Sequence, residues 1–130
     1  MSRPSIDIET QNSMFDVIKS GWVSQGKKTE EFEANLSEYF SSKVVVVNNG
    51  TSALTAALLA HGIKSGDKVV VPSFTFVATS SAAKLIGAKI IIADVDTETL
   101  NITPNSIEKI VKEHGDIKAV LIVDMAGQPL

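Results

Sequence analysis

The chain has 130 residues, of which 44% are hydrophobic and 21% are charged, a balance typical of one soluble globular domain rather than of a disordered chain. Its formal net charge of -3 and its scattered lysines give no electrostatic footprint for nucleic acid or for anionic lipid. The chain has no cysteine and no apolar run near the roughly 20 residues that span a bilayer, so we expect a cytoplasmic protein without a membrane or nucleic-acid partner.

Two amphipathic helices are predicted in the first part of the chain. Residues 9–20 carry apolar side chains at helical spacing, and Gly21 follows as a stop signal. A second helical pattern opens at Thr29 and ends near residues 41–42. We therefore expect residues 1–42 to form an N-terminal helical segment that precedes a separate α/β domain in residues 43–130.

From residue 43 onward the chain alternates between short β-branched runs and alanine- or leucine-rich helical segments. The predicted strands are 44–47, 68–71, 90–93 and 119–123, and the predicted helices between them are 51–60, 78–86 and 106–111. This β-α-β-α-β-α-β order implies right-handed crossovers and a parallel sheet between helices. Because ligands bind beyond the carboxyl ends of such strands, we expect a site among loops 48–51, 73–76 and 94–96.

The loop after the first predicted strand suits an anion. In Asn48–Ala53 the free N–H groups and the positive end of the following helix coincide. Gly50 lets a ligand approach the backbone, and the hydroxyls of Thr51 and Ser52 can donate to phosphate oxygens. The alternative is that Asn49 or Thr51 merely caps the helix.

The loop after the second predicted strand carries an aromatic pair. Phe74 and Phe76 stand where a flat heteroaromatic ligand could stack, although packing in the core explains either residue nearly as well. An exposed phenylalanine over the same crevice as a phosphate loop would favour an aromatic phosphate cofactor. The two loops together therefore suggest one composite site.

Other patterns are assigned no chemistry. Residues 21–29 nearly match a P-loop, but Lys28 stands where Ser or Thr is needed and the preceding segment is helical, so a nucleoside-triphosphate site is rejected. Asp94 and Asp96 are interpreted as local hydrogen-bond acceptors of a turn. No metal site is predicted, because neither histidine has a second ligand at metal spacing.

Taken in order, these motifs resemble the DegT/DnrJ/EryC1/StrS family of aminotransferases. The similarity covers essentially the whole chain, and the combination is far more specific than any single piece. It is carried by residues 20–22, 26, 32–33, 49–54 (NGTSAL), 66–69, 72–79 (PSFTFVAT), 87–88, 94–96, 101–102 and 107–108.

The resemblance implies the N-terminal part of a fold-type I transferase large domain that depends on pyridoxal 5′-phosphate (PLP). It implies that Gly50, Thr51 and Ser52 hold the cofactor phosphate and that Phe76 stacks on the pyridine ring. It also implies a homodimer that transfers an amino group, commonly from glutamate, to a nucleotide-linked keto sugar in amino-sugar and polysaccharide biosynthesis. Residues 24–28 would lie near the substrate entrance.

Two parts of the family's machinery fall outside the region of resemblance. The Schiff-base lysine and the aspartate that pairs with the pyridine nitrogen follow the region that matches 123–130, so no catalytic residue is assigned and we expect the 130-residue chain alone to be inactive. Asp124 stands where many members have histidine, which leaves the substrate subgroup open. The alternative is a non-catalytic module that binds a phosphorylated ligand or a partner.

Overall fold

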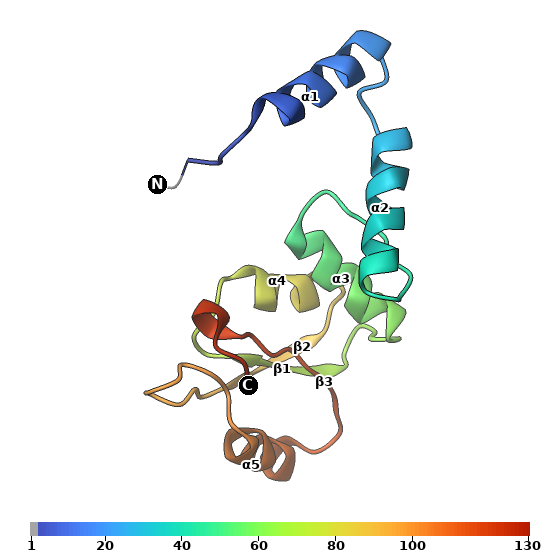
Figure 1. Cartoon of the computed structure of the whole chain (residues 1–130). Helices are drawn as coiled ribbons and strands as arrows, with labels where there is room; N and C mark the ends of the chain where they lie inside the picture. The colour runs from blue at the N-terminus through green and yellow to red at the C-terminus, as the bar shows by residue number, and fades with distance from the viewer. Residues whose placement is uncertain (1–2) are drawn as a thin grey trace. The chain divides into compact units, whose positions relative to one another are not determined.

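The computed structural model describes residues 3–130 (Figure 1), and the sequence divides into two compact units between Val46 and Val47. The predicted division after residue 42 stays a prediction. None of the helices in residues 3–130 is both long enough and apolar enough to cross a bilayer.

The first unit contains two helices, α1 (Ile8–Ser20) and α2 (Lys27–Tyr39). Helix α1 begins where the carboxylate of Asp7 accepts the N–H of Thr10 at 2.8 Å, and it ends at Gly21, which has the left-handed φ of 74° that favours glycine. Helix α2 begins two residues before the predicted start. Neither helix buries a residue completely, and no residue from 3 to 46 is buried.

The strand predicted at residues 44–47 is wrong, because residues 43–47 form no regular secondary structure. The N–H of Val46 donates to the Glu33 carboxylate at 2.8 Å, and the N–H of Val44 donates to the Ser37 hydroxyl at 3.0 Å. A strand needs a neighbouring backbone to complete its ladder, and within the described residues side chains of α2 take that place. A valine run alone does not supply the partner.

The second unit has the predicted alternation from its first helix onward. It contains α3 (Gly50–Ala60), β1 (Lys68–Pro72), α4 (Ala78–Leu85), β2 (Lys89–Ala93), α5 (Pro104–His114), β3 (Ile117–Val120) and the 3-10 turn η1 (Met125–Gly127). The three strands are parallel, in the order β2-β1-β3. The third strand ends before the predicted residue 123, although the N–H of Leu121 still donates to the Val70 carbonyl at 2.9 Å.

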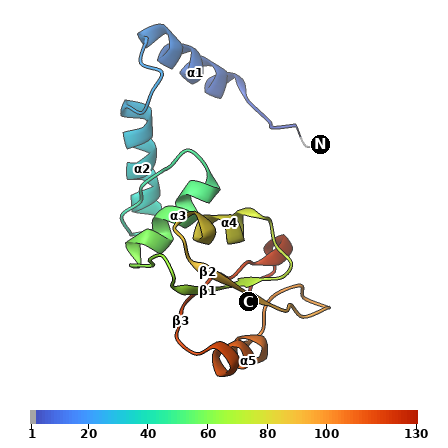
Figure 2. The ribbon, with the colours of Figure 1, turned by 180° about the vertical axis from the view of Figure 1, so that it is seen from behind.

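The core lies on both faces of β1. Val69 and Val71 pack with buried residues of α3 and α4, whereas Val70 packs against the opposite cluster, which includes Ile110 of α5. Figures 1 and 2 show α3 and α4 over one face of the sheet and α5 over the other. The loop after β1 therefore turns toward the face that carries α4, while the loop after β2 crosses to the face that carries α5.

Candidate functional site

A groove of about 940 Å³ lies at the carboxyl edge of the sheet, on the face that carries α3 and α4. Three segments that are distant in the sequence line it: the start of α3, the loop from β1 into α4, and the stretch after β3. Its residues fall within 49–57, 75–79 and 123–126. Gly50, Thr51 and Phe76 are all among them, so the structure brings together three of the four predicted site residues.

The N-terminus of α3 presents free donors to the groove. Asn49 is the cap, because its Oδ1 accepts the N–H of Ser52 at 2.9 Å and its carbonyl accepts the N–H of Ala53 at 3.1 Å. The N–H groups of Gly50 and Thr51 and the Thr51 hydroxyl have no hydrogen-bond acceptor among the described residues. The two interpretations of this loop are thus compatible: Asn49 caps the helix, and its neighbours remain open to an anion.

Gly50 leaves room rather than relieving strain. It is not among the glycines with positive φ, and a Cβ built at this position would meet no atom within 4 Å. Neither the backbone conformation nor internal packing therefore requires glycine here. The missing side chain keeps the positive end of α3 open to the groove, which fits a ligand that approaches the backbone closely.

Phe76 supplies an apolar surface at the same site. Its side chain is 76% exposed and lines the groove, which excludes core packing as the explanation for this residue. Phe74 is 52% exposed and is not among the lining residues. Ser52 also does not line the groove, and its role in phosphate binding stays a prediction.

The groove is nearly free of charge. Asp124 is the one ionisable side chain among its lining residues in the described chain, and its Oδ1 accepts the N–H of Leu130 at 3.2 Å. No lysine or arginine lines the groove within residues 3–130. An anion bound there would therefore be stabilised by the α3 N–H groups and the helix dipole, not by a cationic side chain.

The loop at residues 94–96 does not line the groove, contrary to the sequence prediction. The connection after β2 crosses to the α5 face and so leads away from it. Asp96 instead organises a turn, accepting the N–H groups of Thr99 at 2.8 Å and Glu98 at 3.0 Å. These hydrogen bonds confirm the interpretation of Asp96 as a local acceptor, and the one from the Thr99 N–H is the main cause that lowers the pKa of Asp96.

Sequence reasoning missed the third wall of the groove, residues 123–126. The signal was present, since residues 124–126 follow a predicted strand just as the first two loops do. It also missed Asn101, which is only 4% exposed and whose amide contacts the backbone of this wall.

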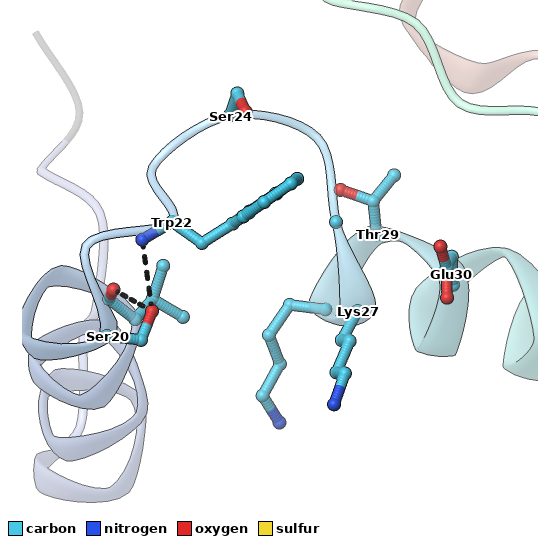
Figure 3. A pocket seen from close by; sticks show the side chains of 9 residues that line it. Ser20, Trp22, Ser24, Lys27, Thr29 and Glu30 are labelled. Atoms are coloured by element: carbon cyan, nitrogen blue, oxygen red, sulfur yellow. Dashed lines mark hydrogen bonds between the residues drawn. The ribbon is translucent and has the colours of Figure 1, made fainter.

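A second hollow, of about 400 Å³, lies within the first unit between the end of α1 and the start of α2. Figure 3 shows Trp22 projecting from the loop over it, with Lys27 across from Ser20. The Trp22 indole N–H donates to the Gln25 carbonyl at 2.8 Å. Because α1 precedes this loop, the strand that a P-loop requires is missing here, as the helical pattern of residues 9–20 predicts.

The second unit has the α/β fold of a part of the fold-type I PLP-dependent aminotransferases. An aminotransferase from Psychrobacter cryohalolentis shares 35% identity over 99% of this chain and 33% of its own, with a TM-score of 0.88. A model of the DegT/DnrJ/EryC1/StrS aminotransferase family matches residues 4–130, so the chain belongs to this family.

Two further solved structures extend the comparison. A family member from Brucella abortus is 34% identical over 92% of this chain and 34% of its own, with a TM-score of 0.81. The GDP-4-keto-6-deoxy-D-mannose-3-dehydratase of Escherichia coli, solved with bound hydrated PLP, is 25% identical over 99% of this chain and 34% of its own, with a TM-score of 0.87. The chain thus spans about a third of the length of the structures it matches.

Proposed function

We propose that this chain forms the phosphate- and ring-binding part of the PLP site of a sugar aminotransferase. The observation that carries the proposal is the groove that joins the open N-terminus of α3 to the exposed ring of Phe76. A phosphate matches the free N–H donors, and a flat pyridine ring matches the aromatic face. A phosphate ligand without an aromatic ring would leave Phe76 without a partner.

The residues of this chain would bind the cofactor phosphate and orient the cofactor ring. The N–H groups of Gly50 and Thr51, with the hydroxyls of Thr51 and Ser52, would hold the phosphate, while Phe76 would cover one face of the ring and exclude water from it. PLP, when bound, supplies the electron sink on which amino transfer depends. No lysine lines the groove in residues 3–130, so we assign the Schiff-base lysine to the part of the enzyme that corresponds to the other two thirds of its relatives.

We propose a nucleotide-linked keto sugar as the substrate and an amino donor such as glutamate, in a cytoplasmic homodimer that serves amino-sugar and polysaccharide biosynthesis. The substrate in the name of the Escherichia coli relative, GDP-4-keto-6-deoxy-D-mannose, is a sugar of this kind. The full-length enzyme should convert glutamate to 2-oxoglutarate over many turnovers only when such a sugar is present as the amino acceptor. Multiple turnovers that do not depend on the sugar would contradict this substrate class.

Calorimetric titration with pyridoxamine 5′-phosphate (PMP) tests the cofactor site. PMP has no aldehyde, so it cannot react with the surface lysines, and heat reports binding in the groove rather than covalent labelling. We expect saturable 1:1 binding of PMP and much weaker binding of pyridoxamine, which lacks the phosphate. Equal binding of the two compounds, or binding of neither, would contradict the proposal.

The second candidate is a non-catalytic module that binds a phosphorylated ligand, which the absence of lysine from the groove lining favours. A parallel titration with inorganic phosphate separates the two candidates, because inorganic phosphate can bind at the α3 N-terminus but has no ring to stack on Phe76. Tighter binding of PMP than of inorganic phosphate supports the PLP site. Equal affinities would favour the general phosphate module.

A further inference from the structure

Asn101 forms a buried clamp between two segments of the second unit. Its side-chain Oδ1 accepts the N–H of Met125 at 3.0 Å, and its Nδ2 donates to the carbonyl of Gln128 at 3.1 Å. Asn101 is 4% exposed, so water cannot readily replace either partner. The amide therefore uses both its acceptor and its donor to fix one turn.

That turn carries a wall of the groove in a strained conformation. Ala126, inside η1, has φ 53° and ψ 24°, the left-handed region that a residue with a Cβ seldom adopts. Met125 and Ala126 line the groove, whereas Asn101 does not. Such a conformation persists only where surrounding contacts hold it, and the bonds from Asn101 bracket Ala126 on both sides.

Asn101 is itself held in place by the turn after β2. The Asp96 carboxylate accepts the N–H of Thr99, the Thr99 hydroxyl accepts the N–H of Asn101 at 3.3 Å, and the N–H of Asp96 donates to the Asn101 carbonyl at 2.9 Å. Leu100, between them, has a left-handed φ of 59°. The loop after β2 does not line the groove, contrary to the prediction, but it holds Asn101, which contacts the turn that forms a wall of the groove.

We propose that Asn101 is a positioning residue for the cofactor groove, acting through the Met125–Gly127 turn. Its amide keeps Ala126 in the left-handed conformation and so sets the shape of the groove without touching the ligand. The identity of the ligand rests on the proposed function, whereas the mechanical link between Asn101 and the groove wall does not.

Asn101→Asp is the sharpest perturbation, because it keeps the shape and the acceptor for Met125 but replaces the donor to Gln128 with an oxygen. We expect PMP affinity to fall about tenfold, as the loss of a buried hydrogen bond predicts. In Asn101→Leu, which removes the acceptor as well as the donor, the Met125 amide should exchange with deuterium faster. Ile110→Val, in the cluster on the opposite face of the sheet, serves as a control that lowers thermal stability without changing PMP affinity.

Ala126→Gly supplies the rescue, since glycine adopts the left-handed region without steric cost. In the Asn101→Asp background it should restore much of the PMP affinity, an effect that a merely structural role for Asn101 would not produce. Unchanged affinity in Asn101→Asp, or no recovery in the double variant, overturns the proposal. If the wild-type protein binds no PMP, the proposed function fails, and hydrogen exchange alone decides: unchanged protection of the Met125 amide in Asn101→Leu, which removes its acceptor, overturns the clamp.

Discussion

Replacing Thr51 by valine should weaken cofactor binding while leaving the stability of the protein unchanged. The Thr51 hydroxyl has no hydrogen-bond partner among residues 3–130, and valine has nearly the same shape, so folding loses nothing. A bound phosphate loses one charge-assisted hydrogen bond. Such a bond contributes about 1.5–3 kcal/mol, so the dissociation constant for PMP should rise roughly 10- to 150-fold.

Asn49→Ala is the matched counterpart at the same helix end. Asn49 accepts the Ser52 N–H at 2.9 Å, and loss of such a cap costs about 1 kcal/mol. In a domain of this size that corresponds to a fall of roughly 3–5 °C in the midpoint of thermal unfolding. Thr51→Val should therefore lower the affinity for PMP, whereas Asn49→Ala should lower the midpoint of thermal unfolding.

Calorimetry with PMP gives the affinities, and circular dichroism during heating gives the unfolding midpoints. If Thr51→Val binds PMP as tightly as the wild type, the hydroxyl does not contact the phosphate. If Thr51→Val instead melts as early as Asn49→Ala, Thr51 takes part in capping and the assignment of roles at this helix end is wrong.

Three further predictions follow from single contacts. Phe76→Leu should weaken binding of PMP but not of inorganic phosphate and should leave stability unchanged, because the ring is 76% exposed; parallel losses for both ligands would show that the ring does not stack. Gly26→Ala would place a Cβ 2.5 Å from the Trp22 Nε1, so the indole must move, and the fluorescence maximum of the chain's single tryptophan should shift; an unchanged spectrum contradicts the close approach. The pKa of Asp96 is lowered in the folded protein, so its carboxylate stabilises the fold above the ordinary carboxyl pKa of about 4, and this contribution disappears as the pH falls through the lowered value. Asp96→Asn should flatten the decline in unfolding midpoint below pH 4, and an identical decline would exclude Asp96 as a source of acid sensitivity.

The alternation of helices and strands could be predicted from the sequence because each element carries its own periodicity. The valine run at 44–47 shows where this fails, because a strand also needs a neighbour. Within the described residues the polar side chains of Glu33 and Ser37 take the N–H groups of Val46 and Val44, and no local pattern indicates this.

The candidate site was predictable where it depends on local order along the chain. The donors near Gly50 follow from the start of a predicted helix, and the ring of Phe76 follows from the strand-to-helix loop after β1. The third wall was wrongly assigned to residues 94–96. The face of the sheet to which each loop turns depends on the strand order β2-β1-β3, and no local sequence pattern indicates that order. The sequence marked Asn101 as part of a family motif but did not indicate its role, since its amide partners lie 24 and 27 residues away.

The most direct test of the central claim is a ¹⁵N–¹H correlation spectrum of the protein recorded during titration with PMP. We predict the largest amide shifts at Gly50 and Thr51, smaller shifts around Phe76, and no change in the Trp22 indole signal. Shifts confined to residues 17–30, with Gly50 and Thr51 unmoved, would contradict the claim that the N-terminus of α3 and the Phe76 ring form the cofactor site.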